Sequence, residues 1–219
     1  MRIFLNQIKI IITTLVIAFV AGVSILAVNS LSTNDTKTEL SANYIPSDMS
    51  KAFPELDGVL EGGDASMLTT NIEDVKGQIQ YTIRGTVVNI GNLEEWKDPT
   101  PQPEEFQKIM GQNVKFPIDI EVTQIEKTKS DLKVGEIITV KVLGSLIDNT
   151  LYLYPNSPQF EVGEDVIVHV SIDPNDIIEK DFKFVQLGEY GKYKIQNGKA
   201  FNEQYPNGKA IKDALEEAQ

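Results

Sequence analysis

The chain of 219 residues has no cysteine, one tryptophan, one histidine (His169) and two arginines (Arg2 and Arg84). Without cysteine, disulfides, thiolate nucleophiles and thiolate metal sites are excluded. One histidine cannot supply the clustered imidazoles of a zinc or copper site, and no Gly-x-Ser-x-Gly elbow accompanies it for a Ser-His-Asp relay. Because His169 alternates with Val168 and Val170, the sequence predicts that it lies on the outer surface of a strand.

Positive charge is also scarce. The formal net charge is −12, and without Arg2 and Lys9 the remainder carries 18 basic against 32 acidic residues, a net charge of −14. Such a body repels nucleic acid, which proteins bind mainly by neutralising phosphates. No Gly-x-Gly-x-x-Gly or phosphate-loop motif occurs either. We therefore expect no nucleic-acid partner, no cofactor and, since no catalytic motif is present, no enzyme activity.

The N-terminal part contains one long apolar segment. Nineteen uncharged residues run from Ile10 to Val28, which is long enough for a helix that crosses a bilayer. Basic residues precede the segment and acidic ones follow it, so residues 1–28 are predicted to anchor the protein in the cell membrane as a single pass, with the body outside the cytoplasm. The alternative is a signal peptide cleaved after Ser30, which would release a secreted protein.

Three further parts follow the anchor. Residues 29–49 are mostly polar and are predicted to be a flexible linker, in which Asn34 begins a glycosylation sequon. Residues 50–205 are predicted to form an extracytoplasmic β-barrel domain, and residues 206–219 a C-terminal helix. Within the body, residues 104–110 are expected to form another short helix.

Two ten-residue segments, 133–142 and 161–170, share the pattern x-Val-Gly-Glu followed by alternating Val or Ile. Alternation with β-branched residues is typical of a half-buried strand, and the glycine in front of each marks a turn. We expect both strands at the centre of the domain, paired or stacked. Their apolar faces are Ile138, Val140 and Val142 in the first and Val166, Val168, Val170 and Ile172 in the second.

Six more segments have strand-like patterns or end in turn residues. They are 78–90, 116–123, 150–154, 181–187, 191–195 and the residues that follow the Asn197-Gly198 hairpin turn. The fold class is therefore mainly β, a small antiparallel OB-like barrel or sandwich with short helices, preceded by one N-terminal transmembrane helix. One short helix is expected to use Phe53, Leu56, Val59 and Leu60.

Several motifs resemble a widespread set of uncharacterised exported or membrane-anchored bacterial and archaeal proteins. They are Ile118–Glu126, Val134-Gly135-Glu136, Leu143-Gly144, Phe160-x-x-Gly163-Glu164 and Leu187-Gly188-Glu189-Tyr190-Gly191-Lys192-Tyr193. The resemblance covers residues 79–203 and implies a small OB-like β-barrel behind a signal or anchor, with no catalytic residues. The chain departs from it at Ser145, where a second glycine is usual, and in a longer insertion that carries Trp96.

Candidate site residues are few. The densest acidic cluster offers a weak calcium site, although it lacks the central glycine and regular spacing of a calcium loop; its members are Asp173, Asn175, Asp176, Glu179 and Asp181. The acids Asp57, Glu61 and Asp64 are predicted to be solvated. One set of aromatic residues could bind a carbohydrate or peptide ligand. The alternative is that these residues belong to the core. They are Tyr81, Tyr152, Tyr154, Tyr190 and Tyr193.

Three functions are compatible with these observations. The first is a membrane-tethered extracytoplasmic β-barrel module with a binding or structural role in the cell envelope, whose partner would be an envelope protein or a glycan. The second is an accessory subunit of a membrane complex. The third is an envelope hydrolase that uses two carboxylates placed by the fold.

Overall fold

The computed structural model describes residues 44–61, 72–97, 111–154, 157–173 and 178–219. The anchor segment Ile10–Val28, the sequon at Asn34 and the helix expected at 104–110 lie outside these residues. Among the helices of the described part, none is long and apolar enough to span a membrane.

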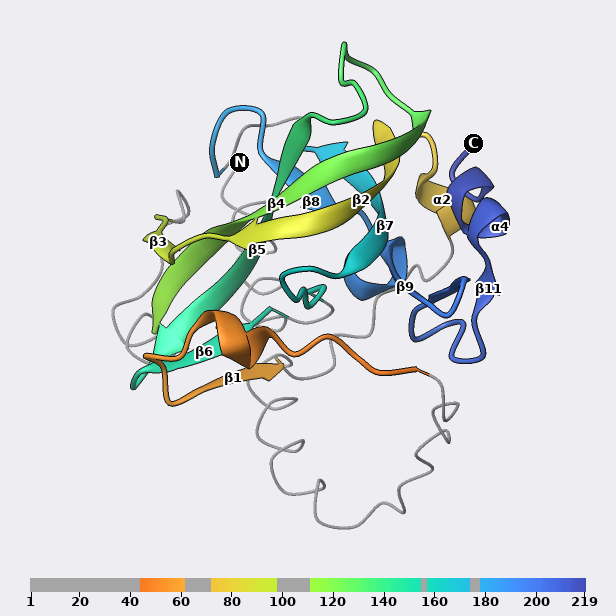
Figure 1. Ribbon diagram of the computed structural model, residues 1–219. Coiled ribbons are helices and arrows are strands. Elements are labelled where there is room, and N and C mark those ends of the chain that lie inside the picture. Colours follow the sequence, from red (N-terminus) through yellow and green to blue (C-terminus); the bar gives the residue numbers. More distant parts are fainter. Residues whose placement is uncertain (1–43, 62–71, 98–110, 155–156, 174–177) are drawn as a thin grey trace, which may run out of the picture. The chain divides into compact units, whose positions relative to one another are not determined.

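Eleven strands of the described part form one sheet (Figure 1). They are β1 (Gly58–Glu61), β2 (Tyr81–Ile90), β3 (Glu94–Glu95), β4 (Gln112–Lys127), β5 (Ile137–Ile147), β6 (Thr150–Leu153), β7 (Asp165–Ile172), β8 (Lys183–Val185), β9 (Lys192–Gln196), β10 (Lys199–Phe201) and β11 (Lys209–Ala210). Their order is β1-β6-β5-β4-β2-β7-β9-β10-β11, with β3 paired to β4 and β8 paired to β7. Every strand predicted from the sequence is present; β1, β3 and β11 were not predicted.

Only four short helical segments accompany the sheet in the described residues. They are η1 (Met49–Ala52), α2 (Ile72–Val75), η2 (Gly188–Gly191) and α4 (Ile211–Glu216). The domain is thus mainly β, as predicted, and all its strand pairs are antiparallel except β1 with β6. The C-terminal helix is shorter than predicted because Lys209 and Ala210 pair with β10 as a strand before the helix begins.

The inner face of the sheet carries the main core. Val140 on β5 and Val168 on β7 are both fully buried in the same cluster, as the alternation predicts. Of the two arrangements expected for their strands, paired or stacked, pairing is wrong, because β4 and β2 lie between β5 and β7. The two similar segments therefore occupy matching positions on either side of a central β4–β2 pair. The rest of this cluster includes Phe116, Ile118, Ile120, Ile83, Val87, Leu151 and Phe160.

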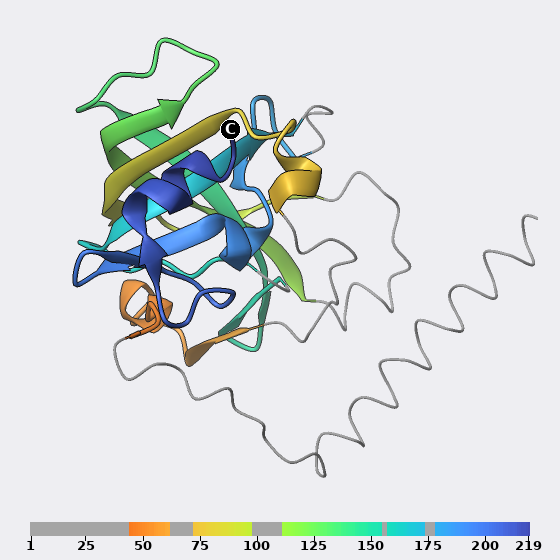
Figure 2. The same cartoon turned by 90° about the vertical axis from the view of Figure 1, so that its right-hand side faces the viewer.

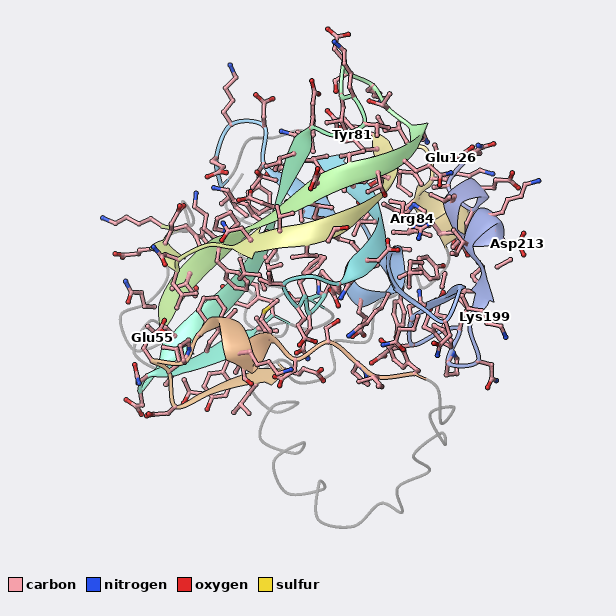
Figure 3. The ribbon with its side chains drawn as sticks, in the orientation of Figure 1. Glu55, Tyr81, Arg84, Glu126, Lys199 and Asp213 are labelled. Atoms are coloured by element: carbon pink, nitrogen blue, oxygen red, sulfur yellow. The ribbon has the colours of Figure 1, made fainter. Side chains whose placement is uncertain are left out.

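The sheet curls into a half-barrel because β8, which is paired to β7, also contacts β5. Charged side chains link the same two regions. The carboxylate of Glu179, just before β8, contacts the ammonium groups of Lys115 on β4 and Lys141 on β5, the latter at 2.7 Å. Other charged side chains point outward at the periphery, as Glu55, Glu126 and Asp213 do in Figure 3.

The outer face of β7 is covered as well. Helix α4 lies across it in Figure 2, and Ile167 packs there with Tyr193, Ala214 and Leu215. His169 points to this same side and is 0 % exposed, so the prediction of a surface histidine is wrong. The alternation of the strand was read correctly, but a period of two does not reveal that the C-terminal helix covers the second face.

The segment before Ser50 is also part of the packed domain. Ser47 and Met49, which the sequence places in the linker, are buried, and Met49 belongs to the main core. The short helix expected after it is wrong in part: Phe53 follows η1, whereas Val59 and Leu60 lie on β1. Parallel pairing with β6 offers this segment backbone hydrogen bonds that a short isolated helix would not supply.

Candidate functional site

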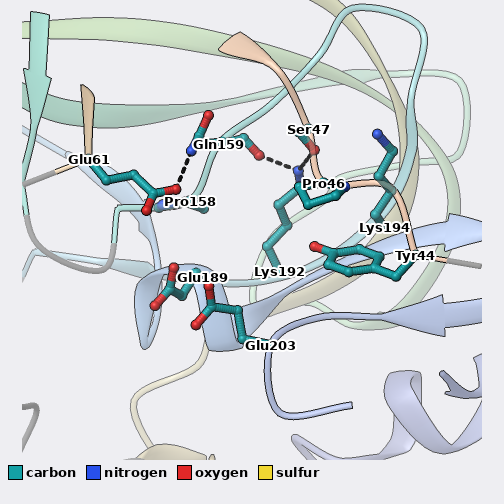
Figure 4. Close-up of a pocket in the computed structure, with 10 residues that line it drawn as sticks. All are labelled: Tyr44, Pro46, Ser47, Glu61, Pro158, Gln159, Glu189, Lys192, Lys194 and Glu203. Carbon is teal, nitrogen blue, oxygen red and sulfur yellow. Dashed lines mark hydrogen bonds between the residues drawn. The ribbon is translucent and has the colours of Figure 1, made fainter. Parts of the chain in front are cut away.

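A small pocket lies where the two ends of the sheet approach each other. Its volume is about 60 Å³, which has room for about four water-sized groups (Figure 4). On one side is Glu61, the last residue of β1, and on the other are residues of β9 and of the turn after β10. Residues 44–47 and 158–159 lie between these two sides. The lining residues are Tyr44, Pro46, Ser47, Glu61, Pro158, Gln159, Glu189, Lys192, Lys194 and Glu203.

An ion pair lies at the inner end of this pocket. The Nζ atom of Lys192 lies 2.6 Å from Oε1 of Glu164, and their side chains are 7 % and 3 % exposed. The hydroxyl of Ser47 donates to the other carboxylate oxygen of Glu164 at 2.6 Å and accepts from Lys192 at 2.7 Å. The backbone carbonyl of Gln159 also accepts from Lys192. The ammonium group is therefore surrounded by oxygen atoms, and the ring of Phe160 lies 4.5 Å away.

Burial weakens the hold of Lys192 on its proton. Desolvation outweighs the opposing effect of the nearby Glu164 carboxylate, and together they lower the pKa of Lys192 to about 8. Lys194 is less tightly paired, with its Nζ atom 3.5 Å from Glu164 and 3.7 Å from Glu161. Glu161 is shared with Lys51, whose Nζ atom lies 2.7 Å from Glu161 and 3.9 Å from Asp48. Three lysines thus face three carboxylates, and this part of the site is close to electrically balanced.

The glutamate of this ion pair comes from the second Val-Gly-Glu turn. In that turn the N–H of Gly163 donates to the carbonyl of Val87 at 2.8 Å, and the N–H of Val87 donates to the carbonyl of Glu164 at 3.0 Å. Gly163 has a φ of 88°, a backbone angle that residues other than glycine rarely adopt. The strand that carries Val87 therefore fixes where Glu164 enters the core.

The first Val-Gly-Glu turn makes the same backbone contacts with Val122 but has a different side-chain outcome. Gly135 donates to the Val122 carbonyl at 2.8 Å, and Val122 donates to the Glu136 carbonyl at 2.9 Å. The side chain of Glu136 stays exposed and accepts the N–H of Lys133 at 2.9 Å. The chain thus uses one turn twice, and only the second copy contributes a carboxylate to the interior.

Tyr44 forms another wall of the pocket. Its ring stacks on Phe201 with centroids 5.7 Å apart. Burial, and after it the negative charges of Glu203, Glu164, Glu189 and Glu61, together raise the pKa of Tyr44 to about 12. The phenol therefore stays protonated over the ordinary pH range and faces a region of negative potential.

Residues 44–47 are fastened to the domain on both sides of Pro46. The side-chain amide of Gln196 accepts the N–H of Ile45 at 3.1 Å and donates to its carbonyl at 3.0 Å. On the other side, Ser47 is held by the ion pair described above. The pocket wall made by this segment is consequently ordered by contacts with β9, which carries both Gln196 and Lys192.

The predicted calcium cluster is only partly visible. Asn175 and Asp176 lie outside the described residues, and Asp173 and Asp181 flank them. Glu179 is engaged by Lys115 and Lys141, which compete with any cation for its oxygens. Within the described ranges, no group of three or more histidine, aspartate or glutamate side chains is arranged to hold a metal ion.

The predicted aromatic set is not gathered into one site. Tyr81 is buried in the main core, whereas Tyr193 is buried on the other face of the sheet, where it donates a hydrogen bond to Glu217. Burial and this carboxylate raise the pKa of Tyr193. The tyrosine of the pocket, Tyr44, was not in the set.

Sequence reasoning missed most of the pocket. Tyr44 and Ser47 fell in the predicted linker, and Glu61 was interpreted as a solvated acid. One signal was present: Glu164 and Lys192 both lie in the glycine-punctuated motifs, where a charged residue next to a strand start is repeated. No protein-family model matches the chain, and no curated protein matches it in sequence. The arrangement of the pocket therefore carries the functional argument.

Proposed function

We propose that this chain is a membrane-tethered extracytoplasmic β-barrel module of the OB-like kind, and that its pocket binds the cationic group of a ligand. The tether rests on the apolar segment Ile10–Val28 and on the basic residues before it. The barrel rests on the curled sheet and on the motif resemblance. The binding role rests on the charges around Tyr44.

The charge balance of the lining favours a cation. Lys192, Lys194 and Lys51 are matched by Glu164, Glu161 and Asp48, so these charges nearly cancel. None of the salt bridges described for the domain includes Glu203, yet its charge is the largest electrostatic contribution to the raised pKa of Tyr44. Glu203 lies beside Glu189 in Figure 4. An ammonium group placed there would gain from the carboxylate of Glu203 without displacing a lysine from any of the salt bridges described above.

The size of the pocket sets the class of ligand. A volume of about 60 Å³ admits a head group but does not enclose a hexose ring. This pocket is therefore too small for the site of a carboxylate hydrolase, which holds a sugar unit between two carboxyl groups. The ammonium of a lysine side chain and that of an amino sugar share the required chemistry. The lysine ammonium represents a protein partner and the amino-sugar ammonium a glycan partner. The tighter-binding of the two therefore indicates which kind of envelope partner the pocket prefers.

Ligand-observed NMR on the full chain in detergent micelles tests the proposal. The probes are Nα-acetyl-lysine amide and glucosamine, with the uncharged Nα-acetyl-norleucine amide and N-acetylglucosamine as matched controls. We expect only the charged probes to bind, with millimolar affinity that weakens as salt is added. Glu203→Gln should reduce binding several-fold, whereas the exposed Glu55→Gln should not. Equal binding of charged and uncharged probes would contradict a cation site.

The accessory-subunit alternative is favoured by no contact in the described domain. It predicts instead that the chain copurifies with a fixed membrane partner and that pocket variants leave this association intact.

A further inference from the structure

Three buried polar atoms next to β7 have no hydrogen-bond partner among the described residues. They are Nε2 of His169, Oε1 of Gln80 and Oε1 of Gln186. Buried polar atoms are nearly always paired, so three in one region call for a common explanation. His169 lies on the opposite face of the sheet from the main core, and none of the three residues lines the pocket at Tyr44.

The register of the sheet brings these three residues next to one another along β7. His169 on β7 is directly opposite Thr82 on β2, and Gln80 lies two residues before Thr82, just ahead of β2. The backbone N–H of Gln80 donates to Val170, the neighbour of His169, at 2.8 Å. On the other side of β7, the N–H of Gln186 donates to the carbonyl of His169 at 2.8 Å. The imidazole is therefore flanked by one glutamine on each side.

A close backbone approach holds Gln186 in this position. The carbonyl oxygen of Gln186 lies so near Gly191 that a β-carbon at Gly191 would overlap it. Leu187, the next residue, is buried in a cluster with Ile79 and Ala218. This gives the Leu187–Gly191 motif a structural role, which is to keep Gln186 beside the histidine.

The protonation state of His169 decides what the three atoms need. Burial, and after it the positive charges of Lys209 and Lys127, together lower the pKa of His169 to about 3, so the ring is neutral. A neutral imidazole has one N–H and one acceptor nitrogen. The hydroxyl of Thr82 lies 3.1 Å from Nδ1, and if it donates there, the proton is on Nε2. The three atoms then comprise one donor and two acceptors.

We propose that one water molecule binds between Nε2 of His169 and the side-chain oxygens of Gln80 and Gln186. A water molecule accepts one hydrogen bond from Nε2–H and donates one to each glutamine oxygen, so all three atoms are satisfied. If the proton were on Nδ1, three acceptors would face the two hydrogens of water, and one would stay unpaired. Matching hydrogen-bond donors to acceptors thus assigns both the ligand, water, and the tautomer of His169, with the proton on Nε2.

The surrounding charges exclude ionic ligands. Lys209 and Lys127, whose charges act on His169, repel a metal ion or an ammonium group in the same position. The two glutamine oxygens present the negative ends of their dipoles and so repel an anion. A small neutral molecule that donates two hydrogen bonds meets both conditions, and water is the one present in every compartment.

Because His169 is the only histidine in the chain, imidazole NMR observes this site without ambiguity. On the full chain in detergent micelles with ¹⁵N-labelled histidine, we expect the Nε2–H tautomer near neutral pH. We also expect a direct nuclear Overhauser contact between that proton and a water signal, with the sign that indicates a long-lived bound water.

Variants separate bound water from a direct histidine–glutamine bond. Gln80→Leu and Gln186→Leu should each weaken the contact with water, whereas Gln78→Leu, at an exposed position two residues before Gln80, should leave it unchanged. A Nδ1–H tautomer, or a Nε2–H without any contact to water, would overturn the proposal. So would a loss confined to one of the two glutamine variants, because a direct bond involves only one glutamine.

Discussion

Glu164 and Lys192 form an ion pair at 2.6 Å inside a chain that has a nearly identical exposed turn elsewhere. The backbone of the Gly135-Glu136 turn makes the same hydrogen bonds as that of the Gly163-Glu164 turn. What differs is the strand that pairs with the one following each turn. The second turn leads into β7, which pairs with β9, and β9 carries Lys192. The first turn leads into β5, which pairs with β6. The same local sequence thus gives a solvated capping group in one place and a buried charge in the other.

Breaking this ion pair should strongly destabilise the domain. We expect Glu164→Gln or Lys192→Met to lower the free energy of unfolding by about 3–5 kcal/mol, since each leaves a buried charge without its partner. The double variant Glu164→Leu with Lys192→Met should recover most of that loss. Glu136→Gln is the matched control and should change stability by less than about 0.5 kcal/mol. Denaturant unfolding measures all four; equal effects of Glu164→Gln and Glu136→Gln would contradict the assignment.

Alternating patterns predicted the strands of this protein well, because most of the long strands bury one face in the main core. Val140 and Val168 are examples, and the Asn197-Gly198 hairpin is another, with φ values of 50° and 74° in its two turn residues. Strand order was not predictable in the same way. It depends on contacts between distant segments, and two similar segments look like neighbours when they are in fact separated by two strands.

The candidate site could not be predicted because its residues come from segments that have no pattern of their own. Ser47 lies in a polar stretch that resembles a linker, and its burial depends on Glu164 and Lys192, more than a hundred residues away in sequence. The burial of His169 likewise depends on a helix at the far end of the chain. Local sequence reports which face of a strand is apolar, but not what covers the other face.

Core positions on β5 and β7 should not tolerate charge. We expect Val140→Asp and Val168→Asp each to destabilise the domain by several kcal/mol, because each buries a carboxylate without a partner. Val134→Asp is the control, since Val134 is 63 % exposed at the start of the same segment as Val140. Thermal unfolding followed by circular dichroism measures the effect. A core variant that melts within about a degree of the parent would show that the strand faces are assigned incorrectly.

Calcium should not stabilise the protein specifically. Glu179 is already paired with Lys115 and Lys141, so a bound calcium ion would have to displace two ammonium groups to use it. A specific ligand raises stability with the logarithm of its concentration over its Kd, whereas screening of the negative body is shared by all divalent salts. We therefore expect millimolar calcium to raise the melting temperature no more than magnesium does. A calcium-specific rise of many degrees that Asp176→Ala abolishes would contradict this.

The N-terminal segment should remain on the mature protein. The run Ile10–Val28 is longer than the apolar part of a signal peptide, which spans about 7–15 residues, and the residues before Leu31 make a poor cleavage site. We expect the protein to stay with the membrane fraction and its intact N-terminus to be found by mass spectrometry. A mature chain that starts near Leu31 would instead establish the secreted form.

The buried histidine should make stability depend on pH in one direction. The pKa of His169 is about 3 in the folded protein against an ordinary value near 6.5, so between these values only the unfolded chain binds the proton. The contribution of His169 to stability is complete above pH 6.5 and is lost as the pH falls toward 3, by at most about 1.4 kcal/mol per pH unit.

His169→Gln removes the titrating group and keeps a polar side chain, so the stability of this variant should fall less on acidification. Between pH 6.5 and 4.5 we expect the parent to lose about 2 kcal/mol more than the variant in denaturant titrations. Parallel curves would mean that the imidazole gains its proton as easily in the folded protein as in water, which its complete burial beside Lys209 and Lys127 does not allow.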